Sequence, residues 1–274
     1  MYIQLQFRFD DVTEANYETA VIIRNCLRNF IDIILKPLCT YIAIFIRFDI
    51  DFLSHLPKTT ETNSVLLSLD VVSLYTNIPY DLRIKAIKYW VDKHREAIPN
   101  RFTVTFILDS VKLILENNTF FFNGKNYIQI KGMAMGTRFA PVYANSVMGY
   151  LEQKLHQEIE ERCSTEFRTY IEKAWKRYLD DCFIIRTKSQ NTVKEFKFLL
   201  NNLHPSIQFT NEMSSTKLPF LDIMVIKKNT TITTYIYYKQ IQINTWILNR
   251  AIHRIQNVTS HTSWPEESVL LQKI

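Results

Sequence analysis

Arg177-Tyr-Leu-Asp-Asp-Cys-Phe-Ile-Ile185 places two adjacent carboxylates between two short apolar segments. The pattern over 175–186 predicts two short strands, with Asp180 and Asp181 in the turn that joins them. Aspartate is a common turn residue, so an ordinary polar turn also explains the pair. Charged side chains at the end of a buried hairpin are nevertheless costly unless a partner or a cation compensates them. We therefore treat the pair as a candidate site.

A third carboxylate ends another apolar run. Val65-Leu-Leu-Ser-Leu-Asp70 is typical of a buried strand, and Asp70 is its last residue. If Asp70 lies beside Asp180 and Asp181, three mutually repelling carboxylates meet at one sheet edge and favour divalent cations. Oxygen ligands select hard ions, so we expect Mg²⁺, with Mn²⁺ as an alternative. Two such ions about 4 Å apart activate an attacking hydroxyl and stabilise a leaving pyrophosphate.

The rest of the chain alternates irregularly between helical and strand patterns. Apolar residues recur at helical spacing over 16–48, with a break before Pro37, and Asp81 is placed to cap the helix after Pro79. Further elements are predicted as helices at 105–116, after Pro141 and at 192–202, a hairpin at 119–130 around Asn123-Gly124, and strands at 206–212, 218–226 and 231–238. This order favours an α+β fold with an antiparallel sheet over a doubly wound one.

Charge is unevenly distributed along the chain. The net charge is +6, but residues 1–60 carry six Lys or Arg against seven Asp or Glu, and the remaining 214 residues carry 27 against 20. A basic surface after residue 60 favours phosphate backbones, although it also suits an ordinary soluble protein. The four cysteines form no closely spaced pair, and the longest apolar stretch is ten residues. We therefore expect an intracellular protein, nuclear or cytoplasmic, without a signal peptide or a transmembrane segment.

Several segments resemble the polymerase motifs of reverse transcriptases, most closely those of Penelope-like retroelements. In chain order they are Asp70-Val-Val-Ser-Leu-Tyr-Thr-Asn-Ile-Pro79, Lys131-Gly-Met-Ala-Met-Gly-Thr-Arg-Phe-Ala-Pro141, Arg177 to Ile185, and Phe220-Leu-Asp-Ile-Met-Val225. Each motif alone is weak, but their shared order over a long separation is specific. The resemblance covers about residues 60–240.

The resemblance implies a role for individual residues. Asp70 resembles the first metal-binding aspartate of the family, and Asp180 with Asp181 resembles the pair in the following hairpin. Tyr75 resembles the aromatic residue beneath the sugar of the incoming nucleotide, where a flat ring excludes a 2′-hydroxyl. A tyrosine packed in the core is the alternative interpretation.

The glycine-containing loop at 131–137 resembles the segment that lines the nucleotide pocket. Met135 and Gly136 fall at nucleotide-binding positions, and many other reverse transcriptases have glutamine in place of Met135. Gly132 and Gly136 would let the backbone approach the template or the nucleotide closely. An ordinary pair of turn glycines is the alternative.

The resemblance implies three regions: a partial fingers-like helical region at 1–60, a reverse transcriptase palm at 61–240, and a diverged thumb remnant or tail at 241–274. Relative to the family, the chain is shortened at both ends. The implied function is RNA-directed DNA polymerisation, with an RNA or DNA primer–template and deoxynucleoside triphosphates as partners. The main alternative is a catalytically inactive retroelement remnant that retains nucleic-acid binding. A two-metal nuclease with another fold would use a similar carboxylate cluster but would not explain Tyr75.

Overall fold

The structure is a computed structural model that describes residues 7–9, 14–116, 118–122, 125–129, 132, 137–163, 165–187 and 190–237. The chain divides into two units, 1–237 and 238–274, and every described residue belongs to the first. The segment predicted as a thumb remnant, 241–274, therefore lies outside the described residues. Among the helices of the described part, none is long and apolar enough to cross a membrane.

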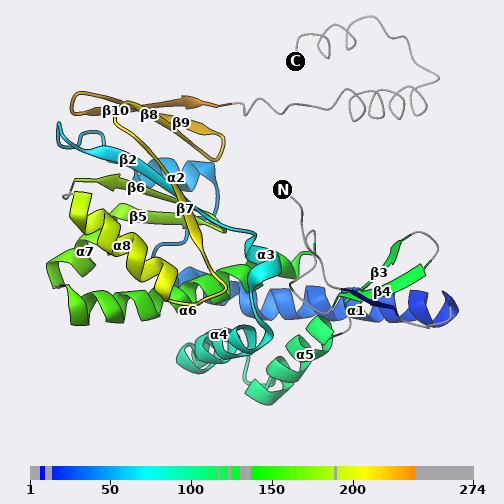
Figure 1. The fold of residues 1–274 in the computed structure, drawn as a ribbon. Coiled ribbons are helices and arrows are strands. Elements are labelled where there is room, and N and C mark those ends of the chain that lie inside the picture. Colours follow the sequence, from blue (N-terminus) through cyan, green and yellow to red (C-terminus); the bar gives the residue numbers. More distant parts are fainter. Residues whose placement is uncertain are drawn as a thin grey trace, which may run out of the picture. The chain divides into compact units, whose positions relative to one another are not determined.

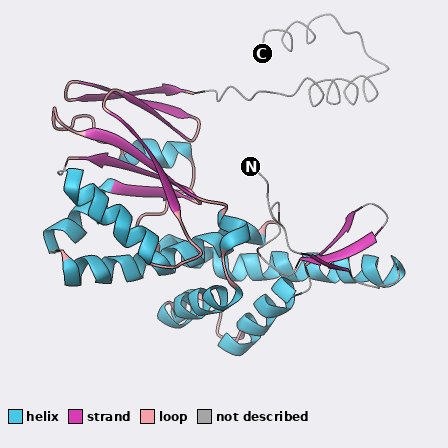
Figure 2. Cartoon of the chain, in the orientation of Figure 1, coloured by secondary structure: helices cyan, strands magenta, loops and turns pink. Residues whose placement is uncertain are grey.

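Helices and strands alternate irregularly along the first unit, as Figures 1 and 2 show. In chain order the elements are β1 (Phe7–Phe9), α1 (Glu14–Leu35), η1 (Lys36–Tyr41), α2 (Asp49–His55), β2 (Val65–Val71), α3 (Leu74–Asn77), α4 (Tyr80–Lys93), η2 (Arg95–Ala97), α5 (Val104–Glu116), β3 (Thr119–Phe122), β4 (Lys125–Gln129), α6 (Phe139–Arg162), α7 (Thr165–Ala174), β5 (Trp175–Tyr178), β6 (Asp181–Arg186), α8 (Gln190–Asn202), β7 (Phe209–Ser214), β8 (Lys217–Phe220), β9 (Ile223–Lys228) and β10 (Thr231–Ile236).

A four-stranded antiparallel sheet, in the order β5-β6-β2-β7, forms the centre of the fold. Two smaller antiparallel sheets have the orders β10-β9-β8 and β1-β4-β3. The predicted α+β fold with an antiparallel sheet is therefore confirmed. Strand β2 lies between β6 and β7, both of which follow it by more than 100 residues, so the sheet joins distant parts of the sequence.

Strand β2 faces two hydrophobic cores because alternate residues of a strand point to opposite faces of the sheet. Leu67, Leu69 and Val71 belong to the larger core, which helices α1, α4, α6 and α8 complete; we call it the helix-side core. Leu66 belongs to a smaller core with residues of α2, β6, β8 and β9, which we call the hairpin-side core. Helices cover one face of the sheet, while the β8–β10 sheet and α2 cover part of the other (Figure 1).

Helix α6 is the main support of the helix-side core. Its backbone accepts a hydrogen bond from the Trp90 indole of α4, with 2.8 Å between Nε1 and the Ser146 carbonyl oxygen. Gly149 lets α6 approach its neighbours closely: a Cβ there would lie 2.8 Å from the Ile42 side chain and 3.0 Å from the Trp90 ring. The helix after Pro141 was predicted from its apolar face, and that face is buried.

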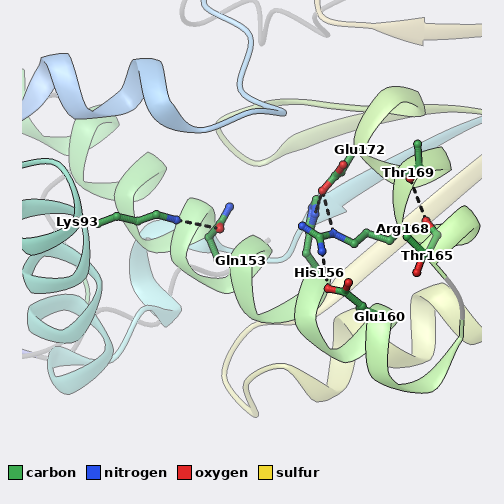
Figure 3. A network of polar contacts seen from close by, with 8 residues as sticks. All are labelled: Lys93, Gln153, His156, Glu160, Thr165, Arg168, Thr169 and Glu172. Carbon is green, nitrogen blue, oxygen red and sulfur yellow. Dashed lines mark hydrogen bonds and ion pairs between the residues drawn. The ribbon is translucent and has the colours of Figure 1, made fainter.

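A polar network joins α6 to α7 (Figure 3). Nδ1 of His156 on α6 lies 2.9 Å from Oε1 of Glu172 on α7. Arg168 donates to the same Glu172 oxygen from Nε at 3.1 Å, and it also pairs with Glu160 of α6. The His156 and Arg168 interactions hold the pKa of Glu172 below its ordinary value, although partial burial acts in the opposite direction. The network therefore ties α7 to α6 through charge.

Several details differ from the predictions. The single strand expected at 218–226 is two strands, β8 and β9, joined by a turn in which Leu221 has a left-handed φ of 53°. Asp81 does not cap α4: the N-cap is Pro79, and Asp81 lies inside the first turn of the helix. Helices α2, α3 and α7 and strand β1 were not predicted.

Candidate active site

The register of β2 against β6 brings two of the predicted carboxylates together. Asp70 is the direct partner of Asp181 in the antiparallel pair, although 111 positions separate them in sequence. Direct partners in such a pair have Cα atoms about 4.5–5.5 Å apart and side chains on the same face. Both carboxylates therefore leave the sheet on its hairpin side, at the end where β2 finishes.

The third carboxylate lies in the turn that precedes β6. Because Tyr178 pairs with Asp181, only Leu179 and Asp180 form the turn, and Leu179 has a left-handed φ of 52°. A side chain with a Cβ rarely adopts this conformation. Val71 directly follows Asp70 in the chain, and its amide donates to the Asp180 carbonyl oxygen at 3.1 Å. Asp180 is thus attached through its backbone to the strand that carries Asp70.

Tyr75 lies in the electrostatic field of this turn. The pKa of the Tyr75 phenol is raised to about 12, mainly by burial and to a lesser extent by the neighbouring Asp180 and Tyr178. Burial also raises the pKa of Asp180, while the positive charge of Arg177 acts against that increase. Tyr75 is on α3, a single turn that begins after Ser73, whose φ of 49° is also left-handed. It is half-buried against the helix-side core, so its ring is both a core contact and a neighbour of Asp180.

Gly132 makes a close approach to the backbone of α3. A Cβ at Gly132 would lie 2.7 Å from the Thr76 Cα and 2.9 Å from the Tyr75 carbonyl oxygen, and its φ is +74°. Gly132 therefore lies directly on the backbone that carries Tyr75. The approach of Gly132 and Gly136 to template or nucleotide stays a prediction. Met135 and Gly136 lie outside the described residues.

No protein-family model matches this chain, and no curated protein matches its sequence. Solved structures match it in fold. Apo telomerase from Candida tropicalis, truncated of its C-terminal domain, aligns with a TM-score of 0.54 over 76% of this chain and 45% of that chain, at 13% identity. Telomerase from Candida albicans in complex with a fragment of telomeric RNA gives 0.55 over 85% and 43%, at 9% identity. An RNA-dependent RNA polymerase determined with vp4 and double-stranded RNA gives 0.50 over 73% and 20%, at 12% identity.

The chain has a polymerase-like fold. It spans less than half the length of the telomerase chains that it matches. At these identities the likeness concerns the arrangement of the backbone.

Within this polymerase-like fold, the carboxylates suit a divalent cation in donor type and in backbone placement. Asp70, Asp180 and Asp181 offer only oxygen ligands, which hard cations prefer. Their side chains do not form a closed ligand set as they stand: no group of three or more His, Cys, Asp or Glu in the described part of the chain is gathered closely enough to hold a metal ion. Asp70 is exposed, and Asp180 and Asp181 are partly exposed, so solvent and the cations dissolved in it reach all three residues.

A buried charged pair that was not predicted lies behind the turn. Arg177 of β5 and Glu152 of α6 are 0% and 3% exposed in their side chains, and they form an ion pair. A signal was present in the sequence, because Arg177 alternates with apolar residues in a predicted buried strand. Glu152 similarly lies between Leu151 and Leu155 on the apolar face predicted for α6.

Proposed function

We propose that this chain is the palm of a nucleic-acid polymerase that extends a primer 3′ end. The observation that carries the proposal is the pairing of Asp70 with Asp181, beside Asp180, in a polymerase-like fold. The motif order favours RNA-directed DNA synthesis of the Penelope-like retroelement type. Telomerase with telomeric RNA and a polymerase with double-stranded RNA share the fold, which supports a primer–template of RNA or DNA as the partner.

Asp70, Asp180 and Asp181 would hold two Mg²⁺ ions in this proposal. Bound there, the ions would activate the primer hydroxyl and stabilise the charge on the leaving pyrophosphate. The protein contributes the placement of its three carboxylates, which the β2–β6 register and the hydrogen bond from Val71 to Asp180 define. Burial around Asp180 lowers the local dielectric, which strengthens its attraction for a cation.

Tyr75 would select the sugar of the nucleotide. Its ring lies near Asp180 and is anchored from below by the helix-side core. A rigid ring at this position leaves no space for a 2′-hydroxyl, so deoxynucleotides are favoured. We expect Tyr75→Ala to raise ribonucleotide incorporation relative to deoxynucleotide incorporation, and Tyr75→Phe to preserve the wild-type ratio. An unchanged ratio in an active Tyr75→Ala protein would leave Tyr75 as a core residue only.

Primer extension with Mg²⁺ tests the polymerase proposal directly. We expect wild-type protein to extend a primer on an RNA template, and Asp180→Asn to lose at least about 100-fold in rate because a transition-state ligand is removed. Asp222→Asn is a matched control, because Asp222 also follows a left-handed leucine, Leu221, in a two-residue turn. Extension that is equal in the two variants would reject the site assignment.

An inactive chain that only binds nucleic acid is the second candidate. The excess of 27 basic over 20 acidic residues after residue 60 favours it, because such a surface attracts phosphates without any catalytic group. Salt-dependent binding of a primer–template without any extension, in wild type and in both Asn variants, would select this candidate.

A further inference from the structure

Arg177 makes four hydrogen bonds although its side chain is completely buried. Nε pairs with Oε1 of Glu152, and Nη2 donates to Oε2 of the same carboxylate at 3.3 Å. Nη1 donates to Oδ1 of Asn145 at 2.8 Å and to the Leu179 carbonyl oxygen at 3.0 Å. One guanidinium thus connects two residues of α6 to the turn that carries Asp180.

Stability alone does not explain this buried pair. Removing two charges from water costs about as much as their attraction returns, and well-packed apolar residues often replace such a pair without loss. The fold therefore gains little net stability from Arg177 and Glu152. What an apolar pair cannot supply is a donor for the Leu179 carbonyl oxygen.

The turn can also close without a guanidinium. The β8–β9 turn has the same Leu-Asp sequence, and Leu221 has a φ of 53° against 52° for Leu179. At the position that corresponds to Arg177 this second turn has Pro219, which has no side-chain donor. The bond from Arg177 is therefore not a requirement for a left-handed leucine in such a turn.

The backbone of Arg177 is held on the side away from β6. Its amide donates to the Ile44 carbonyl oxygen at 2.8 Å, and its carbonyl oxygen accepts from the Ile46 amide at 2.9 Å. The side chain starts from a fixed strand and ends on a fixed helix, so the Leu179 carbonyl oxygen is bonded to a rigid donor.

We propose that Arg177, oriented by Glu152 and Asn145, is a positioning residue that fixes the Leu179–Asp180 turn and thereby holds Asp180 beside the Asp70–Asp181 pair. The metal-binding role of Asp180 rests on the proposed function, but the ordering of the turn by Arg177 can be measured even if that function is wrong. Partners behind metal ligands commonly change metal affinity by about 10- to 100-fold when they are removed.

The test uses Arg177→Met/Glu152→Leu, which removes both charges together and keeps their approximate volume. We expect its melting temperature to stay near that of wild type, whereas hydrogen exchange of the Val71 amide, which donates to Asp180, rises about tenfold. Exchange of the other β2 amides should not change. Affinity for Mn²⁺, measured by its electron paramagnetic resonance signal, should fall by about 10- to 100-fold.

Arg177→Lys is the second variant, because lysine keeps the charge for Glu152 but lacks the planar fork. It should fold and should repeat the Val71 and Mn²⁺ effects. Unchanged Val71 exchange in either folded variant would overturn the inference, and so would the failure of both variants to fold, since the network would then be structural. If wild type binds no Mn²⁺ and matches Asp180→Asn, the proposed function fails, while Val71 exchange still decides whether Arg177 orders the turn.

Discussion

Replacing Gly132 by alanine should lower the free energy of unfolding more than the same replacement at Gly149. The new Cβ would lie 2.7 Å from the Thr76 Cα, 2.9 Å from the Tyr75 carbonyl oxygen and 3.2 Å from the Thr76 carbonyl oxygen. All three are backbone atoms, so rotation of a side chain cannot relieve the clash. Alanine at a φ of +74° adds strain of its own.

The loss in free energy of unfolding follows from two contributions, the left-handed backbone and the steric clash. Left-handed alanine costs about 1–2 kcal/mol, and overpacking against unyielding atoms costs about 1–3 kcal/mol. The free energy of unfolding should therefore fall by about 2–5 kcal/mol. At roughly 2–4 °C per kcal/mol for a unit of this size, the melting temperature should drop by about 4–20 °C.

Gly149→Ala is the matched control. Its Cβ would meet the Ile42 side chain at 2.8 Å and the Trp90 ring at 3.0 Å, and these are side-chain atoms that can shift. Alanine also gains about 1 kcal/mol of helix propensity over glycine within α6. We expect a net loss of at most about 2 kcal/mol in thermal unfolding followed by circular dichroism. A melting temperature for Gly132→Ala that equals wild type, or exceeds that of Gly149→Ala, would refute the close approach of Gly132 to the Tyr75–Thr76 backbone.

Three further predictions concern charge. In chelator, Asp180→Asn should melt at a higher temperature than wild type, because repulsion among the carboxylates falls. At a Mg²⁺ concentration of tenfold the dissociation constant, the free energy of unfolding of wild type should rise by about 1.4 kcal/mol, and that of the variant should not. Identical responses of the two melting temperatures to Mg²⁺ would contradict the metal site. Glu172→Gln should lower stability by at most about 1 kcal/mol, because the pairs with His156 and Arg168 are partly exposed. The pKa of Glu172 in the folded protein is below its ordinary value of 4.5. The stability difference between wild type and Glu172→Gln should therefore be complete above pH 4.5 and vanish as the pH falls through the folded pKa. Melting curves that keep this stability difference at lower pH would exclude the charge pairing. Affinity for a primer–template, measured by fluorescence anisotropy, should fall at least about tenfold between 50 and 200 mM salt, and a flat response would reject the basic binding surface.

The central sheet was accessible to sequence reasoning because its strands carry strong local signals. Val65 to Asp70 is an apolar run that ends in a charge, and the Asp180–Asp181 pair lies between two more such runs. The apolar pattern alone does not say which strand lies beside which. The proximity of Asp70 to Asp180 and Asp181 could be expected only from the metal site that the three carboxylates would form. The register of Asp70 with Asp181 therefore had to come from the structure.

Other features left little local signal. Helix α7 has only two buried residues, Phe167 and Ile171, so its apolar stripe is narrow, and its link to α6 is the Glu172 network. The left-handed leucines at 179 and 221 were not predictable, because leucine ordinarily avoids this conformation and only the surrounding strands impose it. The split of the strand expected at 218–226 was missed for the same reason.

The central position of β2 has a consequence for the nascent chain during synthesis. Both neighbours of this strand are translated later, and the last residue of β7 is Ser214, 143 positions after Val71. At elongation rates of about 5–20 residues per second, the strand waits roughly 7 to 30 s for its second partner. Throughout that interval at least one edge of β2 has no neighbouring strand to pair with its backbone groups. The growing polypeptide therefore carries an unpaired strand edge, which favours aggregation, until β7 has been synthesised.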